Sequence, residues 1–224
     1  MTPVPATVGS DVRGRAPSFE SFRRWALSDD FPETGRHDYI GGRYVEESEP
    51  EPLFSHNAVK GEIAAMLMSL IGDDGLLTMT RGRVTVPMSE LAVQPDIALI
   101  ASESLDQGRV TLTPHPDRPD DAIEVVGPPD LVVEVVSDES VLRDTRDLFD
   151  LYLRAGVREY WLVDARNLEP VFRLLANGRS EWGEIAPDRE GFRRSPVLGR
   201  RYRLDRRTGR RGEWRYDLIE REPS

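Results

Sequence analysis

Cysteine is absent from this chain of 224 residues, and lysine occurs only once, at Lys60. Without cysteine there is no disulfide, no thiolate metal site and no cysteine nucleophile, which fits a reducing compartment. No apolar run approaches the roughly 18 residues of a membrane span. The N-terminal segment MTPVPATVGSDVRGRAP lacks the apolar stretch of a signal peptide. We therefore expect a cytoplasmic protein with no membrane partner.

The motifs that the chain lacks exclude several classes of enzyme. It contains no P-loop, no dinucleotide-binding glycine fingerprint, no nucleophile elbow and no HExxH zinc motif. The three histidines, His37, His56 and His115, are too scattered along the sequence to suggest a zinc site. The residues left as candidates for chemistry are carboxylates.

The hydrophobic pattern predicts one α/β or α+β domain with a mixed sheet, because helical and strand patterns alternate along the chain. We expect a disordered tail at residues 1–16 and a single domain over 17–224. Expected helices lie at 18–28, 55–71 and 140–155, and a hairpin at 37–48 turns at two glycines. Expected strands lie at 82–88, 94–100, 109–113, 122–126, 130–137 and 158–165, followed by β-hairpins over 170–217.

Two acids occupy unusual positions in these strands. Asp96 follows Pro95 at the start of one strand, and Glu134 lies inside the valine run DLVVEVVS. An acid in a buried strand is costly unless something pairs with it. If the strands are neighbours, the two carboxylates converge on one point. Their mutual repulsion and their burial both disfavour the charged form, so we expect a raised pKa for each acid. Mg²⁺ is one suitable partner, whereas an arginine or a backbone N–H for each acid is the alternative.

Several motifs, taken together, resemble a known family. They are Pro95-Asp96, PDLVVEVVS at 129–137, the run from Asp144 to Asp164 with the pattern D-x7-Y-x-x-A-G-V-x-E-Y-W-L-V-D, the GGRYVE hairpin and His56. Over residues 37–165 the chain resembles the Uma-two family of predicted restriction endonucleases, in the PD-(D/E)XK nuclease superfamily. The resemblance implies the restriction-endonuclease-like fold, a mixed central sheet flanked by helices, here with added C-terminal hairpins.

The same resemblance implies a metal site and an activity. Asp96 and Glu134 would be ligands of Mg²⁺ or Mn²⁺, and the backbone carbonyl of Val135 would be a further ligand. The implied activity is metal-dependent hydrolysis of nucleic acid, with DNA as the expected substrate. The family's lysine is missing, however. Its position two residues after the glutamate is Val136, and the alternative position on the following helix is Leu148, which we expect to be core.

Other residues are candidates to replace that lysine. His56 matches the family's histidine and is expected at the rim of the cleft, although a capping or packing role is the alternative. Lys60 lies one helical turn later on the same face, with a solvated surface lysine as its alternative. Glu46, from the hairpin, is a third candidate acid. Arg143 is expected to point away from the Leu148 side of its helix, and an arginine can hold charge but not act as a base.

Charge is distributed unevenly along the chain. The formal net charge is −10, yet residues 193–215 contain ten arginines and only two acids. That cluster is either a solvated hairpin surface or a surface that binds the phosphate backbone. The functional alternatives are an active Mg²⁺-dependent nuclease and a catalytically silent module that binds nucleic acid or protein. The oligomeric state stays open, with a homodimer as one alternative.

Overall fold

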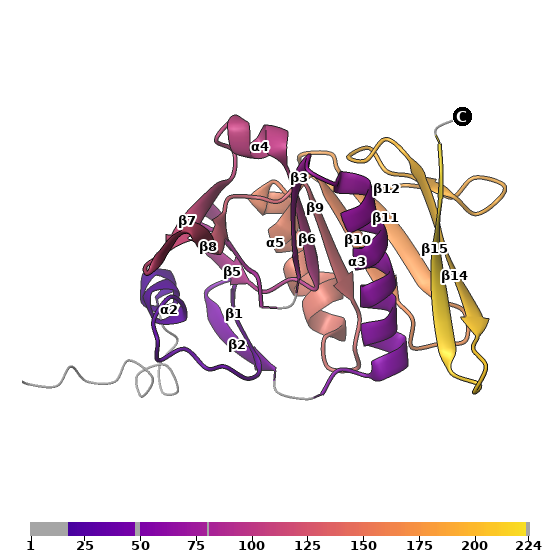
Figure 1. Cartoon of the computed structure of the whole chain (residues 1–224), viewed down its shortest axis with the longest axis horizontal. Coiled ribbons are helices and arrows are strands. Elements are labelled where there is room, and N and C mark those ends of the chain that lie inside the picture. Colours follow the sequence, from indigo (N-terminus) through magenta and orange to yellow (C-terminus); the bar gives the residue numbers. More distant parts are fainter. Residues whose placement is uncertain (1–17, 48–49, 80, 223–224) are drawn as a thin grey trace, which may run out of the picture.

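The structure is a computed structural model, and it describes residues 18–47, 50–79 and 81–222. The expected disordered tail, residues 1–16, lies outside the described residues. Within them the chain forms two six-stranded sheets, one three-stranded sheet and four α-helices (Figure 1). The helices are α2 (Phe19–Ala26), α3 (Ala58–Ile71), α4 (Ser102–Asp106) and α5 (Leu148–Ala155).

The central sheet has the strand order β12-β11-β10-β9-β6-β3. Its strands are β3 (Gly75–Met79), β6 (Ile97–Ala101), β9 (Leu131–Val135), β10 (Glu159–Asp164), β11 (Val171–Asn177) and β12 (Trp182–Glu184). Strands β9 and β10 are parallel, and β6 pairs antiparallel with β9, so the sheet is mixed. The prediction that segments 94–100 and 130–137 are neighbours is therefore confirmed.

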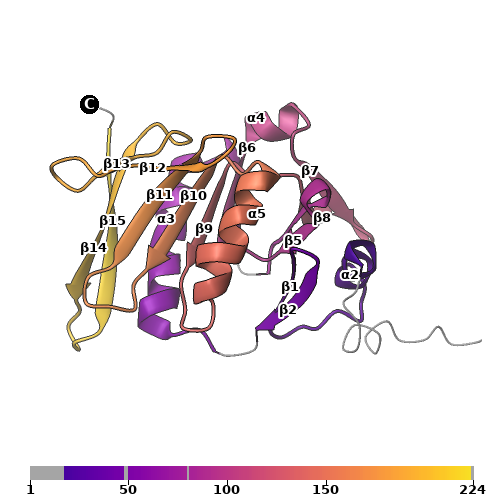
Figure 2. The same cartoon turned by 180° about the vertical axis from the view of Figure 1, so that it is seen from behind.

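Helices α3 and α5 cover opposite faces of the central sheet, as the two opposed views show (Figures 1 and 2). Side chains alternate along β9 and divide the core accordingly. Val133 and Val135 pack in the cluster that contains α3. Val132 and Val136 pack in the cluster that contains α5. Glu134 shares the face of these last two valines, so its carboxylate is buried beneath α5.

The second sheet, with the order β2-β1-β5-β4-β8-β7, was not predicted. It consists of β1 (Arg36–Ile40), β2 (Arg43–Glu47), β4 (Arg83–Val86), β5 (Leu91–Val93), β7 (Thr111–His115) and β8 (Arg118–Val126). The hairpin β1–β2 turns at Gly41 and Gly42, as predicted, and both have the positive φ that this two-residue turn requires. Hydrophobic alternation shows which face of a strand is buried but not which sheet it joins, and this is why one sheet was expected.

The third sheet consists of β13 (Arg193–Arg194), β14 (Arg201–Thr208) and β15 (Trp214–Arg221). Its Tyr202, Leu204, Tyr216 and Leu218 pack into the α3 cluster, so this sheet lies against the outer side of α3 (Figure 1). It provides the added C-terminal hairpin, whereas β11 and β12 extend the central sheet instead.

Both helices that border the site begin in a π-helical turn, Leu53–Asn57 before α3 and Arg143–Asp147 before α5. Such turns change the angular position of side chains relative to a regular helix and are common at functional sites. Helix α5 ends as predicted at Gly156, whose φ of 88° is left-handed.

None of the helices in the described part of the chain is long and apolar enough to cross a membrane.

Candidate active site

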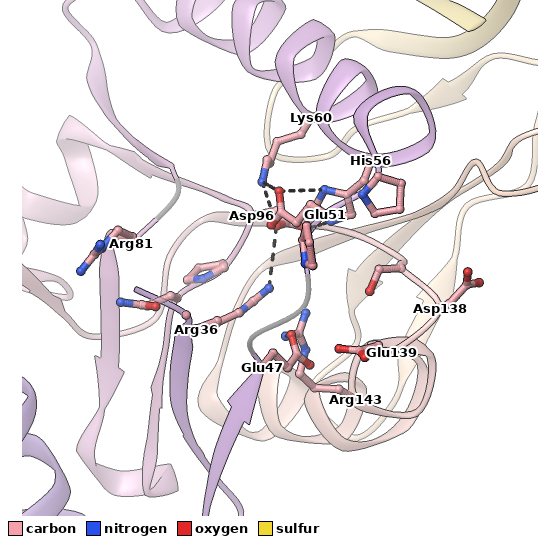
Figure 3. Close-up of a pocket in the computed structure, with 16 residues that line it drawn as sticks. Arg36, Glu47, Glu51, His56, Lys60, Arg81, Asp96, Asp138, Glu139 and Arg143 are labelled. Atoms are coloured by element: carbon pink, nitrogen blue, oxygen red, sulfur yellow. Dashed lines mark hydrogen bonds and ion pairs between the residues drawn. The ribbon is translucent and has the colours of Figure 1, made fainter. Parts of the chain in front are cut away.

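A cleft of about 440 Å³ opens where the first hairpin, the start of α3 and the segment before β6 meet (Figure 3). Charged side chains of both signs line it: Arg36, Glu47, Glu51, His56, Lys60, Arg81, Asp96, Asp138, Glu139 and Arg143. Figure 3 shows His56 and Lys60 pointing from the α3 side toward Asp96, while Arg36 approaches Asp96 from the side of β1.

The backbone holds Asp96 and Glu134 next to one another. Strands β6 and β9 pair as far as Ile97 and Val133, and the two acids lie at the end of this ladder. The amide of Val135 donates to Asp96 Oδ2 at 2.7 Å, and the amide of Asp96 donates to Glu134 Oε2 at 3.3 Å. Asp96 is 3% exposed and Glu134 is 0% exposed. The fold thus brings together the two acids that the sequence singled out.

The backbone of Val135 faces the same point. Its amide donates to Asp96, whereas the next amide, of Val136, donates to Val163 of β10 at 2.8 Å. The N–H and C=O of one strand residue point to the same side. The Val135 carbonyl therefore lies on the Asp96 side of β9.

Arg36, at the start of β1, connects the two acids and was not predicted. Its guanidinium is 3.1 Å from Glu134 Oε2 and 3.8 Å from Asp96 Oδ1, and it also pairs with Asp38 at 3.1 Å. Asp38 in turn accepts the amide of Gln94 at 2.8 Å, which fixes the segment before β6 against β1. The sequence offers only the i, i+2 spacing that places Arg36 and Asp38 on one face of a strand. It does not reveal the distant carboxylates.

His56 and Lys60 complete the cationic surroundings of Asp96. His56 Nε2 is 3.3 Å from Asp96 Oδ2, and Lys60 Nζ is 3.6 Å from Asp96 Oδ1. Both also contact Glu51 Oε2, at 3.2 Å from His56 Nδ1 and 2.6 Å from Lys60 Nζ. Lys60 is buried, so the alternative of a solvated surface lysine is wrong. The π-helical turn and the first turn of α3 place both side chains over the cleft.

The charges around the two acids shift their pKa values in opposite directions. Burial alone raises the pKa of Asp96, but the hydrogen bond from His56 and the charges of Arg36, His56 and Lys60 hold it well below its usual value. Burial raises the pKa of Glu134 to about 7, although Arg36 opposes this shift and the Asp96 charge adds to it. The expectation of a raised pKa for both acids was therefore wrong for Asp96, because three cations surround it, from β1, the π-helical turn and α3.

His56 is charged at neutral pH in this arrangement. Burial lowers the pKa of His56, yet its hydrogen bonds to Asp96 and Glu51 raise that pKa to about 9. For Glu51, burial raises the pKa and the hydrogen bonds of His56 and Lys60 lower it to about 2. A protonated imidazole holds positive charge and can donate a proton, but it cannot accept one.

Helix α5 and its π-helical turn close the other side of Glu134. Tyr152 donates its hydroxyl to Glu134 Oε1 at 2.7 Å, and Arg143 Nη2 is 3.8 Å from Glu134 Oε2. Arg143 also pairs with Glu47 and lines the cleft, although the expectation had placed it only on the side of its helix away from Leu148. The expectation assumed a regular helix, and the π-helical turn removes that regularity.

The chain is similar to a known family over most of its length. A family model, Uma2, described as "Putative restriction endonuclease", matches residues 19–205. The chain belongs to the Uma2 family. The match begins at α2 and reaches β14, and so it is wider than the segment 37–165 that carries the recognisable motifs. No curated protein matches the chain.

A solved structure shares the fold of this Uma2 protein. It is the crystal structure of "a putative nuclease belonging to DUF820" from Anabaena variabilis ATCC 29413, with a TM-score of 0.60 and 16% sequence identity. The alignment covers 81% of this chain and 90% of that one. At this identity the likeness concerns the fold alone, which is the restriction-endonuclease-like fold of a mixed sheet flanked by helices.

Two further acids of this Uma2 chain lie outside the cleft. Glu46 is exposed and accepts the hydroxyl of Tyr44 at 3.1 Å, while its neighbour Glu47 lines the cleft, because successive residues of a strand face opposite ways. Glu62 accepts the amide of Leu218 at 3.1 Å and so joins α3 to the C-terminal sheet. The hairpin therefore contributes Glu47, not Glu46, to the site.

Both positions of the family's lysine are apolar core in this Uma2 chain. Val136 and Leu148 are buried in the cluster beneath α5. The positive charges that face Asp96 come instead from Arg36, His56 and Lys60.

The donor set fits a hard divalent cation. Arg36 shows that Asp96 and Glu134 lie close enough to share one positive group. Carboxylate and carbonyl oxygens are the donors that Mg²⁺ and Mn²⁺ prefer. One ligand atom each from Glu51, His56 and Asp96 also lies within 4.8 Å of the others. A metal bound by both buried acids would take the place of the Arg36 guanidinium.

Proposed function

We propose that this protein is a divalent-metal-dependent endonuclease that hydrolyses phosphodiester bonds in DNA. The observation that carries the proposal is a pair of buried acids that share the Arg36 cation: Asp96 lines the charged cleft, and Glu134 is buried behind it. Two buried acids held together are costly for a fold that does not use them. Membership of the Uma2 family, described as "Putative restriction endonuclease", supports this assignment.

The residues in and behind the cleft would have different roles in phosphodiester hydrolysis. Asp96, Glu134 and the Val135 carbonyl would hold Mg²⁺ or Mn²⁺, which when bound lowers the pKa of a water molecule and polarises the phosphate. Lys60 and His56 carry the positive charge that the missing lysine supplies elsewhere, and they stabilise the charge that develops on the phosphate. Protonated His56 is also the candidate donor of a proton to the leaving oxygen.

Arg36 would have two positions in this proposal. In the metal-free protein it neutralises Asp96 and Glu134. If Asp96 and Glu134 held a metal ion, the Arg36 guanidinium would no longer be needed to neutralise them and would be available to a phosphate oxygen. Glu46 receives no role, because it lies outside the cleft.

A second candidate is a catalytically silent module that binds nucleic acid in the same cleft. The observation that favours it is again Arg36, which satisfies both acids without a metal. The apolar residues at both lysine positions agree with this alternative.

Metal titration with nucleic-acid substrates separates the two candidates. Supercoiled plasmid and single-stranded DNA are incubated with the wild-type protein and Mg²⁺ or Mn²⁺ at millimolar concentration. The nuclease predicts metal-dependent nicking that Glu134→Gln abolishes and that Glu46→Gln, the same change outside the cleft, leaves intact. A thermal-shift titration reports metal binding independently. Nucleic-acid binding without cleavage, and without a metal-dependent shift, would establish the silent module instead.

A further inference from the structure

A second groove, of about 670 Å³, lies beside the cleft. Its walls are the π-helical turn that precedes α3 and the turn between β14 and β15. Pro52 lines both the groove and the cleft. His56 belongs to the same π-helical turn as the apolar wall of the groove. The groove and the cleft are therefore adjacent at Pro52.

The wall formed by the π-helical turn is apolar and faces solvent. Leu53 is 70% exposed and Phe54 is 49% exposed, although large apolar side chains in adjacent positions are usually buried. Trp214 lies on the opposite wall, with the guanidinium of Arg206 at 4.4 Å from its ring centre. The exposed ring of Phe54 offers a face on which a planar group can stack, and the Trp214 ring with Arg206 over it forms the facing wall.

The turn between β14 and β15 adds positive charge that the protein does not neutralise. Most arginines of this sheet pair with nearby acids; for example, Arg207 contacts Asp217 at 2.8 Å and Arg215 contacts Glu213 at 3.0 Å. Arg210 and Arg211 are exposed, and no carboxylate within the described ranges pairs with either guanidinium. Most arginines along the strands of this sheet are thus paired with acids, whereas Arg210 and Arg211, at the turn that borders the groove, are not.

We propose that this groove binds unpaired nucleobases of the strand whose phosphate lies in the cleft, and so makes the protein selective for single-stranded or frayed nucleic acid. The inference rests on the proposed function of the cleft. Aromatic faces together with free arginines are the combination that binds single strands, because every base has a stacking face and every linkage a negative charge. Bases within a duplex are already stacked on their neighbours and are not available to Phe54.

Binding measurements in the absence of metal test the groove. Fluorescence anisotropy compares a 12-nucleotide oligo-dT with a duplex of equal length, using the full chain in EDTA. We expect Phe54→Ala to weaken binding of the single strand about tenfold and to leave duplex binding unchanged. Met88→Ala is the matched control, because Met88 is 96% exposed and lines neither the cleft nor the groove. Replacing Arg210 and Arg211 by alanine should reduce the salt dependence of single-strand binding.

The outcomes separate this inference from the proposed function. Single-strand binding that depends on Phe54, in a protein that cleaves nothing, supports the groove and refutes the nuclease. Cleavage by a protein whose affinity for single strands is unchanged by Phe54→Ala refutes the groove alone. The inference is also overturned if Phe54→Ala weakens the binding of single strand and duplex equally. It is likewise overturned if the wild type binds no nucleic acid, which is the result expected of a groove that binds a protein partner.

Discussion

Replacing Glu134 by glutamine should change stability in a pH-dependent way, because it removes a carboxylate that is wholly buried. Burial raises the pKa of Glu134 from 4.5 to about 7, with Arg36 opposing the shift and the Asp96 charge adding to it. The native state therefore binds this proton more tightly than the unfolded chain does. Stability is unaffected below about pH 4.5 and falls as the pH rises from there through about 7.

The size of the effect follows from the two pKa values of Glu134. Each unit of difference corresponds to about 1.4 kcal/mol, so the ionised carboxylate destabilises the native state by about 3 kcal/mol above pH 7. Glutamine has the shape of the protonated acid and can still accept the hydroxyl of Tyr152. The free energies of unfolding of wild type and Glu134→Gln should thus be similar at pH 4.5, and the variant should be more stable by about 3 kcal/mol at pH 8.

Urea unfolding of both proteins at intervals from pH 4.5 to 8.5 measures this difference directly. Titrating groups that do not interact with Glu134 are common to both proteins and cancel in the comparison. Glu139→Gln is the matched control, since Glu139 lines the same cleft but is exposed, and its difference from wild type should stay flat. A constant difference between Glu134→Gln and wild type across this range would refute the account of Glu134 as a buried, partly protonated acid.

Three further predictions concern the cations around Asp96. Arg36→Met should destabilise the metal-free protein by about 3–5 kcal/mol, because it removes the nearest cation from buried Glu134 and one of three cations from Asp96. It should also enlarge the thermal shift caused by Mn²⁺, and a smaller shift would contradict competition between arginine and metal. Lys60→Gln should slow single-turnover DNA cleavage about a hundredfold if its ammonium stabilises the phosphate, whereas an unchanged rate would limit Lys60 to pairing with Glu51. NMR titration of His56 should give a midpoint near pH 9. The stability that protonated His56 provides is therefore complete below pH 6.5 and is lost as the pH rises through about 9. Asp96→Asn should lower that midpoint, and an unchanged midpoint would show that Asp96 does not stabilise the protonated imidazole.

The sequence by itself determined most elements of secondary structure and the two acids. Periodicity is local, so α2, α3, α5, the hairpin at Gly41-Gly42 and the end of α5 at Gly156 could be predicted without knowledge of the fold, whereas the short helix α4 was not predicted. Glu134 stood out for the same local reason, as an acid inside a run of valines. Its convergence with Asp96 was expected if the two strands were neighbours, and the resemblance to a nuclease family added the role of both acids as metal ligands.

Only the tertiary structure decided what those acids contact. Arg36 lies 98 positions before Glu134 and on a different sheet, and no local pattern relates the two. The π-helical turns, which regular helical spacing does not anticipate, bring His56 and Arg143 into the cleft. The pKa of Asp96 falls rather than rises because cations from β1 and α3 converge on it, and the sign of such a shift depends on distances in space, not along the chain.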